Sequence, residues 1–162
     1  MTTPSDLEVR FLRRFEAPRA LLFDAWTRPE HVRHWWDPSG AELAVCEIDL
    51  RPGGLFRWVN RGECGPGHAF LGTYQEIVPM HRLVFAVPTD SQDSIATLLF
   101  EDVDGATCLD MTIRCSSGME RNALLDRHVD VGTAKTLENL ARYLPHLAEE
   151  GPARTQFPPG PA

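Results

Sequence analysis

The sequence predicts an α+β fold in which a curved antiparallel sheet of about seven strands surrounds a long C-terminal helix. Short polar connections join most of the strand-like segments, which favours antiparallel pairing. The order of elements is one strand, two short helices, six strands and the long helix, so helices and strands do not alternate. A flat sheet of this width would extend beyond a single helix, and we therefore expect the sheet to bend.

The first predicted element is a strand over residues 8–15. Val9, Phe11 and Phe15 share one side of it, as in a strand with one buried face. Arg13 lies on the same side, so we expect it to point inward and to need a carboxylate partner. The candidates for that partner are Glu47 and Asp49.

Two short helices are predicted after this strand. Pro18 suits the first position of the first helix. The second helix starts at Pro29 and carries Trp35 and Trp36 on its apolar face. The turn-forming residues 37–40 end it. We expect one of the two tryptophans to belong to the core and the other to cover one end of a cavity.

Strand-like runs then follow one another up to residue 115. The predicted strands cover residues 41–50, 54–60, 70–78, 82–87, 95–101 and 107–115. Arg-Pro-Gly-Gly at 51–54 and Asp-Val-Asp-Gly at 102–105 are typical of tight hairpin connections. The glycine-rich segment 61–67 is predicted to be a hairpin loop.

The last predicted element is one long helix over residues 121–148. Its apolar residues recur at the i, i+3, i+4, i+7 spacing of a single helical face. They are Leu137, Leu140, Ala141, Leu144 and Leu147. Gly132 interrupts this stripe, and because glycine costs a helix interior about 1 kcal/mol, we expect it to allow a close approach. An ordinary irregularity of the helix is the alternative.

Length and composition indicate one domain over residues 1–150, followed by a disordered tail at 151–162 with four of the 13 prolines. The formal net charge is −7, which argues against binding nucleic acid. There is no long apolar run and no signal pattern, so we expect a cytoplasmic chain without membrane contact.

The cysteines form no CxxC and are expected to be reduced, with Cys64 the most accessible. The histidines lack a metal-binding spacing and no P-loop or GxGxxG motif occurs, so no metal or cofactor is predicted.

Several short motifs occur in a characteristic order. They lie at 13–19, 23–30, 35–36, 49–57, 72–79, 82–84, 132 and 137–144. Over residues 7–148 the chain resembles the START-like (SRPBCC) superfamily of helix-grip proteins. More narrowly, it resembles the branch named after the C-terminal domain of the heat-shock-protein-90 ATPase activator. One departure is Thr133, because the branch commonly carries Trp directly after the glycine that corresponds to Gly132.

The resemblance implies a cavity between the sheet and the last helix. It implies no single activity, because the superfamily includes lipid carriers, hormone receptors, cyclase-like enzymes and co-chaperone modules. If the strand aromatics share the side that faces the helix, they would line a ligand pocket. The candidate lining residues are Trp35, Trp36, Phe56, Trp58, Phe70, Tyr74, Phe85, Phe100, Met111, His128, Thr133 and Leu137. Plain core packing is the alternative for the aromatic ones.

Few polar residues are candidates for orienting a ligand. They are Arg13, Asn60, Tyr74, His128, Asp130 and Thr133. Because imidazole is the side chain that most often transfers protons in enzymes, His128 is the candidate general base. The leading hypothesis is a non-catalytic protein that binds a small apolar or amphipathic molecule. The alternatives are a stress-related or co-chaperone-like interaction module, with a protein partner or a second copy of the chain, and a cyclase- or hydrolase-type enzyme.

Overall fold

The computed structural model describes residues 1–62, 65–89 and 92–149. The elements are β1 (Glu8–Phe15), α1 (Arg19–Thr27), α2 (Pro29–Trp35), β2 (Val45–Ile48), β3 (Leu55–Gly62), β4 (Gly65–Val78), β5 (Arg82–Val87), β6 (Ser94–Val103), β7 (Ala106–Arg114), α3 (Gly118–Asp126) and α4 (Val129–Glu149). The predicted tail 151–162 and Cys64 lie outside the described residues.

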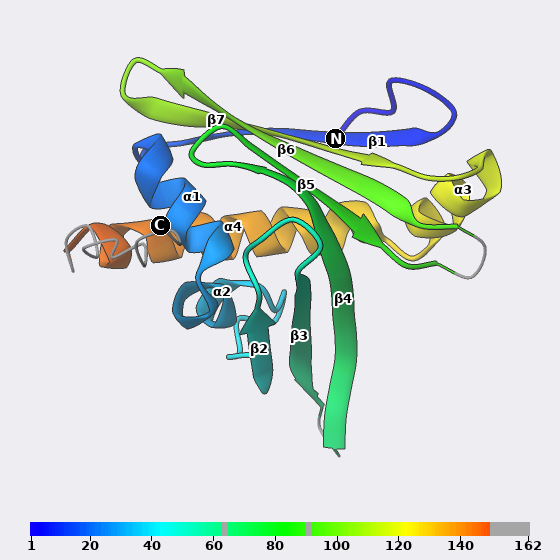
Figure 1. The fold of residues 1–162 in the computed structure, drawn as a ribbon, viewed down its shortest axis with the longest axis horizontal. Helices are drawn as coiled ribbons and strands as arrows, with labels where there is room; N and C mark the ends of the chain where they lie inside the picture. Colours follow the sequence, from blue (N-terminus) through cyan, green and yellow to red (C-terminus); the bar gives the residue numbers. More distant parts are fainter. Residues whose placement is uncertain (63–64, 90–91, 150–162) are drawn as a thin grey trace, which may run out of the picture.

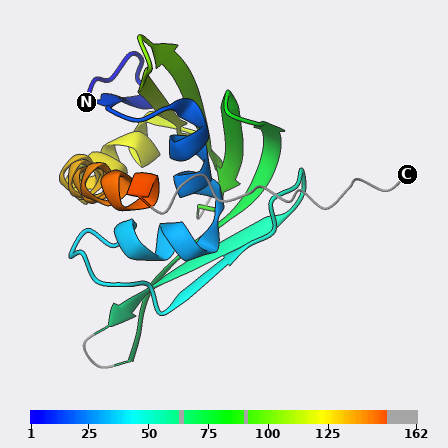
Figure 2. The same cartoon turned by 90° about the vertical axis from the view of Figure 1, so that its left-hand side faces the viewer.

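The strands of the described residues form one seven-stranded antiparallel sheet in the order β1-β7-β6-β5-β4-β3-β2. The sheet curves strongly, so that β2, β3 and β4 turn away from the direction of the other strands (Figure 1). Viewed along α4, the sheet bends around one side of that helix, with α1 and α2 beside it (Figure 2). The predicted helix-grip architecture is confirmed.

The strand register places apolar side chains in rows on the concave face. Phe11 on β1 is opposite Met111 on β7, which is opposite Leu98 on β6. All three are at most 7% exposed. From α4, Leu137 and Leu140 join the same core cluster. The predicted apolar stripe of the last helix therefore packs inside the curve of the sheet.

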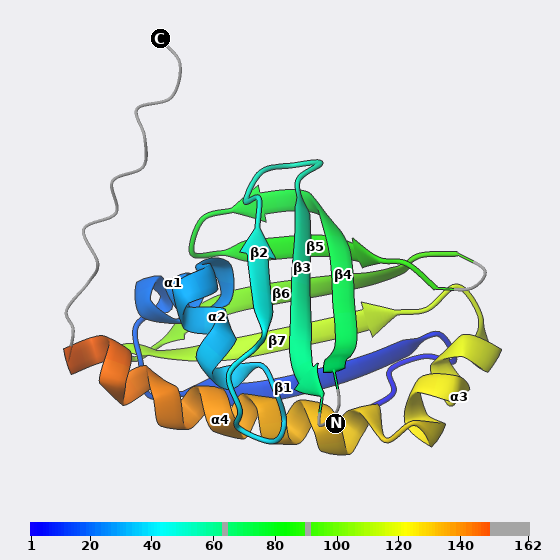
Figure 3. The ribbon, with the colours of Figure 1, turned by 90° about the horizontal axis from the view of Figure 1, so that it is seen from below.

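The predicted single helix 121–148 is in fact two helices, α3 and α4 (Figure 3). The break is at His128, whose φ of 56° lies in the left-handed region. The backbone N–H of His128 donates to the carbonyl of Leu125 at 3.0 Å, which closes the end of α3. At its other end, α3 starts after Ser117, whose hydroxyl accepts from the Glu120 N–H at 3.2 Å.

Gly132 does not serve a close approach, so that expectation was wrong. A Cβ built at Gly132 would meet nothing within 4 Å. In the first turns of α4, from Val129 to Lys135, the side chains are exposed or half-buried. The buried residues of α4 begin at Thr136. The first two turns of α4 therefore pack loosely, and the glycine is not required by contact with the rest of the protein.

Some strand boundaries also differ from the prediction. The predicted strand 41–50 shortens to β2, because Leu43 is buried and its N–H bonds to the carbonyl of Arg33 at 3.0 Å. The predicted loop 61–67 is shorter, since β3 continues to Gly62 and β4 begins at Gly65. Pro18 caps α1 instead of occupying its first turn.

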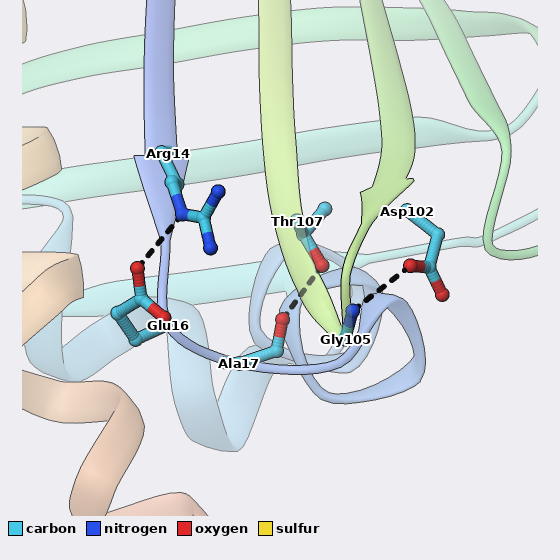
Figure 4. Close-up of polar contacts among 6 residues, drawn as sticks. All are labelled: Arg14, Glu16, Ala17, Asp102, Gly105 and Thr107. Carbon is cyan, nitrogen blue, oxygen red and sulfur yellow. Dashed lines mark hydrogen bonds and ion pairs between the residues drawn. The ribbon is translucent and has the colours of Figure 1, made fainter.

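Both predicted hairpin turns are present. In the β6–β7 turn, Asp104 and Gly105 have φ of 53° and 84°, and the Gly105 N–H donates to the Asp102 carboxylate at 3.2 Å (Figure 4). These backbone angles suit the right-handed twist of a hairpin. Close by, the buried Thr107 hydroxyl donates to the carbonyl of Ala17 at 2.7 Å, which ties β7 to the β1–α1 connection (Figure 4).

The edge of the sheet at β1 is partly covered by the N-terminal arm. Thr2 and Arg10 exchange two backbone hydrogen bonds, at 2.9 and 2.8 Å, in an antiparallel bridge. On the outer face, Arg10 also makes a two-pronged ion pair with Asp110 of β7, at 2.9 and 2.6 Å. The arm and the ion pair together hold β1 at the end of the sheet.

Candidate functional site

An aromatic cluster connects the two short helices with the curved end of the sheet. It consists of Trp26, Trp35, Trp36, Phe56, Trp58, Phe70, Tyr74 and Phe85. Ring centroids of contacting pairs are between 4.6 and 6.4 Å apart, within the range in which aromatic rings attract one another. Seven of these eight residues are predicted site residues, and the structure brings them together.

Strand pairing explains why the rings on the sheet meet. Trp58 is opposite Phe70, and Tyr74 is opposite Phe85. Phe56 is opposite Gly72, and a Cβ on Gly72 would lie only 2.3 Å from the Phe56 ring. Because glycine carries no side chain, the Phe56 ring can lie against the β4 backbone at Gly72. The alternating pattern of aromatic and small residues therefore produces one packed surface.

Trp36 links the rings of the helices to those of the sheet. Its centroid is 6.2 Å from Trp26, 4.6 Å from Trp58 and 5.0 Å from Phe70. Two side chains of α4 hold the backbone beneath it: the Thr136 hydroxyl donates to the Trp36 carbonyl at 3.1 Å, and the Asn139 amide donates to the Asp37 carbonyl at 2.9 Å. The Trp36 ring itself is only half-buried, so water reaches part of it.

The buried tryptophans differ in how their indole N–H groups are satisfied. Trp35 donates to the carbonyl of Ala25 at 3.0 Å. The indole N–H groups of Trp26 and Trp58 are buried and find no acceptor among the residues that the structure describes. A buried donor without an acceptor costs about 1–3 kcal/mol.

The rings of this cluster pack against one another. Phe56, Trp58, Tyr74 and Phe85 are each at most 5% exposed. Two of the hollows among the described residues are open to solvent, and Phe56 is the one residue of this cluster that lines either of them. One, of about 560 Å³, lies between β1 and the start of α4, and the other, of about 320 Å³, lies on the outer face of β3 and β4. The cavity under α4 stays a prediction.

The remaining predicted site residues are distributed over the fold. Phe100 contacts Phe23 at 5.5 Å instead of joining the aromatic cluster. Met111 and Leu137 are buried in the common core. Thr133 is half-buried, and His128 is exposed at the junction of α3 and α4. Asp130 lines the hollow beside β1.

Arg13 has a different partner from those predicted. Its guanidinium lies 3.1 Å from a carboxylate oxygen of Glu138 on α4, and 5.5 Å from the centre of the Phe15 ring. Asp49 instead pairs with Arg51 at 2.8 Å within the hairpin turn. The predicted pairing of Arg13 with Glu47 or Asp49 was therefore wrong, because α4 passes nearer to β1 than β2 does.

The groups proposed for acid–base chemistry do not form a joint site. In the described part of the chain, no hydrogen bond or ion pair connects any two of Arg13, Tyr74 and His128. Burial raises the pKa of the Tyr74 hydroxyl, so it remains neutral at physiological pH. Burial also raises the pKa of the half-buried Cys46 thiol to about 12. Neither group supplies a ready nucleophile or base.

Sequence reasoning missed some residues that shape the site. Trp26 of α1 belongs to the cluster, and nothing in a sequence indicates that its indole N–H lacks an acceptor. Glu138 lies outside the apolar stripe of the last helix, and no local pattern indicates that it reaches Arg13. The hydrogen bond at 2.8 Å between His31 of α2 and Tyr143 of α4 was not anticipated either. Such contacts depend on how the helices dock.

The described residues were also considered as metal ligands, as thiols and as membrane-spanning helices. Within ranges 1–62, 65–89 and 92–149, no three His, Cys, Asp or Glu side chains gather as a metal site would require. Cys46, Cys108 and Cys115 are free thiols. Among the helices described, none combines the length and the hydropathy needed to cross a bilayer.

Comparison with models of known protein families identifies the family to which most of the chain is similar. The family described as "Activator of Hsp90 ATPase homolog 1-like protein" matches residues 16–145 of the chain. Among curated proteins, no significant match is found.

Similar solved structures cover nearly the whole chain. A crystal structure of a protein from Nitrosomonas europaea has a TM-score of 0.82 at 21% identity, covering 91% of this chain and 99% of its own. A protein from Rhodobacter sphaeroides has a TM-score of 0.81 at 26% identity, with coverages of 90% and 97%. A protein from Plasmodium falciparum, described as an HSP90 activator, has a TM-score of 0.66 at 22% identity, with coverages of 86% and 96%.

Proposed function

Because the chain belongs to the Activator of Hsp90 ATPase homolog 1-like family, within the START-like superfamily, we propose that it binds a small, mostly apolar molecule at the aromatic cluster. The observation that carries this proposal is the partial exposure of Trp36 and Phe70. Both rings are half-buried although they pack against a fully buried core. A ligand that covers them removes apolar surface from water, at about 25 cal/mol per Å².

Further apolar residues that pack against the core are also partly exposed. Val87 at the end of β5, Ile113 on β7 and Leu125 on α3 are also only partly buried while they pack against the core. They lie in elements that converge near the start of α4. This end of the concave side carries more apolar surface than the end where Leu140, Leu144 and Leu147 are fully buried. It is the natural entrance for an apolar ligand.

The chemistry of the cluster favours binding over catalysis. Its polar atoms are the neutral Tyr74 hydroxyl, the indole N–H groups and, on β2 opposite Trp58, the protonated Cys46 thiol. These groups donate hydrogen bonds and carry no charge at neutral pH. Such a set can orient a neutral ligand.

A pair of adjacent substitutions on β4 tests the proposal, because successive residues of a strand face opposite sides. Phe70→Glu introduces a charge at the concave aromatic surface, whereas Leu71→Glu places the same charge on the outer face, where Leu71 is 43% exposed. A ligand found by thermal-shift screening and used at 100 times its Kd stabilises the protein by about 2.7 kcal/mol. We expect Phe70→Glu to abolish that stabilisation and Leu71→Glu to preserve it. Equal stabilisation of both variants would contradict the proposal.

A second proposed function is a protein-interaction module, and the outer face of the sheet favours it. Leu55 and Leu71 are 66% and 43% exposed and line the hollow of about 320 Å³ together with Pro88. One structure of similar fold is described as an HSP90 activator, so an Hsp90-type chaperone is the partner to test. Capture of the host's Hsp90-type chaperone by the wild type and by Phe70→Glu, but not by Leu71→Glu, would support this function. Equal capture by all three proteins would exclude the outer face.

A further inference from the structure

The edge of the sheet at β1 is only partly covered by the N-terminal arm. We propose that an extended, acidic segment of another protein pairs with this edge as an additional antiparallel strand, through the backbone groups of Leu12 and Arg14. The proposal goes beyond the ligand-binding function, because it concerns the strand that ends the sheet and not the aromatic cluster. It adds a second binding surface and the kind of partner that fits it.

The hydrogen-bond pattern shows which backbone groups of β1 are free. In antiparallel pairs, bonds are exchanged at alternate residues, and Arg10 exchanges both of its bonds with Thr2 of the arm. Arg10, Leu12 and Arg14 therefore direct their backbone groups away from β7. In the part of the chain that the structure describes, no backbone group bonds to those of Leu12 or Arg14. Two residues of this edge can thus pair with a further strand.

An open hollow lies beside this edge, on the concave side of the sheet. Its volume is about 560 Å³, and its apolar lining includes Phe11 of β1 and Val131 and Ala134 of α4. Val131 is 48% exposed, so water reaches part of this lining. An added strand would direct the side chain opposite Arg13 to the same side as Phe11. We therefore expect an apolar residue at that position of the partner.

The charge of β1 favours an acidic partner. The strand contains three arginines and one glutamate, so its formal charge is +2, whereas that of the whole chain is −7. Arg10 and Arg13 are each bound to a carboxylate of another element. Arg14 pairs with Glu16 in the connection after β1, and these side chains are 50% and 78% exposed (Figure 4). Its guanidinium is therefore accessible to an acidic residue on a neighbouring strand.

The same charges disfavour a second copy of the chain at this edge. If two β1 strands paired about Leu12, Arg10 of one copy would be opposite Arg14 of the other. Like charges directly opposite one another destabilise a pair of strands. A segment with glutamate or aspartate at this position replaces the repulsion by attraction, so the partner is a different protein.

A short peptide tests the proposal. The probe is acetyl-Thr-Val-Glu-Val-Leu-amide, designed so that its glutamate, second valine and leucine lie opposite Arg14, Arg13 and Leu12. It ends there because the arm occupies the edge at Arg10. Amide hydrogen exchange, followed by NMR, should be fast at Leu12 and Arg14 in the free protein and slow at Phe11 and Arg13. The probe at 10 times its Kd should slow exchange at Leu12 and Arg14 by about tenfold.

Two N-methylated forms of the probe separate strand pairing from other modes of binding. Methylation of the leucine nitrogen removes an N–H that faces β1, whereas methylation of the second valine removes one that faces away. The two peptides have the same composition. We expect the first to bind about three- to tenfold more weakly than the unmethylated probe and the second to bind equally well. Equal affinity of the two isomers would overturn the proposal.

Substitutions in β1 test the same contacts from the side of the protein. Leu12→Pro removes one free N–H, and proline is tolerated on an edge strand where the N–H faces solvent. It should weaken binding of the probe about threefold or more, whereas Leu12→Ala, which keeps the N–H, is the matched control. Arg14→Glu should also weaken binding about threefold. A probe with lysine in place of glutamate should recover the affinity for this variant.

The outcomes are independent of the proposed ligand site and of the outer face. Phe70→Glu and Leu71→Glu leave β1 unchanged and should bind the probe like the wild type. If the probe does not slow exchange at Leu12 and Arg14, the proposal is wrong while both proposed functions stand. Protection of these two amides in the free protein that rises with protein concentration would also overturn it, because a second copy of the chain would then occupy the edge.

Discussion

The Phe56 ring lies directly over the backbone of Gly72, its partner in the β3–β4 register. A Cβ on Gly72 would be 2.3 Å from the ring and 2.9 Å from the carbonyl oxygen of Ala86. Phe56 is 2% exposed, so the ring is enclosed by other parts of the protein. The absence of one side chain thus determines how Phe56 contacts Trp58, Tyr74 and Phe85.

Gly72→Ala should therefore destabilise the protein. Overpacking of a filled core costs about 1–3 kcal/mol, and the approach to a backbone oxygen places this substitution in the upper part of that range. Urea unfolding measures the change, and near-ultraviolet circular dichroism reports the repacked rings. An unchanged free energy of unfolding would show that Phe56 has room to move.

Gly132→Ala should have the opposite effect. The new methyl group meets nothing within 4 Å, and φ at this residue is that of an ordinary helix. Alanine improves the interior of a helix by about 0.8–1 kcal/mol relative to glycine. We expect an increase of about that size in the same urea experiment. A loss of stability would indicate a contact that the helix makes in solution.

The ion pair between Arg13 and Glu138 should contribute little to stability. Its side chains are 32% and 50% exposed, and pairs of this kind give about 0–1 kcal/mol. Glu138→Gln should lower the free energy of unfolding by less than about 1 kcal/mol, and high salt should remove the difference. Glu16→Gln, which affects the more exposed pair with Arg14 at 2.8 Å, is the control and should have a smaller effect.

The burial of Cys46 predicts a pH dependence. An ordinary thiol has a pKa near 9.0, and burial raises the pKa of Cys46 to about 12. Between these values the folded protein binds more protons than the unfolded chain, so the free energy of unfolding falls as the pH rises. The stabilisation from a neutral Cys46 is complete below pH 9.0 and is lost as the pH approaches 12.

Cys46→Ala should flatten this alkaline decline without abolishing it, because burial raises the pKa of Tyr74 as well. Urea unfolding at pH values from 8 to 10 measures the slope. Cys108→Ala, which removes another half-buried thiol, on β7, is the control for the loss of a thiol. The same slope in the wild type and in Cys46→Ala would contradict the assignment.

The sequence predicted the parts of the fold that depend on local patterns. The alternation of Phe56 and Trp58, and the turn residues at 51–54 and 102–105, were sufficient for strands and hairpins. The break at His128 was missed, because a left-handed residue other than glycine gives little local signal. Gly132 was the more obvious irregularity, and it lies within an unbroken helix.

For the site, the sequence identified the aromatic residues but not their function. Parity along β3 and β4 indicated which rings share a face. The role of Trp36 as the contact between the helices and the sheet depends on how α2 docks against α4, through residues about 100 positions apart. The missing acceptors for Trp26 and Trp58 depend on every neighbouring atom, which no pattern of residues encodes.

The bridge between Thr2 and Arg10 has a consequence for handling the protein. It uses the backbone N–H and the backbone carbonyl of Arg10 on β1, the edge strand of the sheet. Without the bridge, these groups could pair with a strand of another molecule. Removing the first seven residues would expose them. Preparations shortened in this way should self-associate or aggregate more readily than the intact chain, even where their catalytic or binding surfaces are untouched.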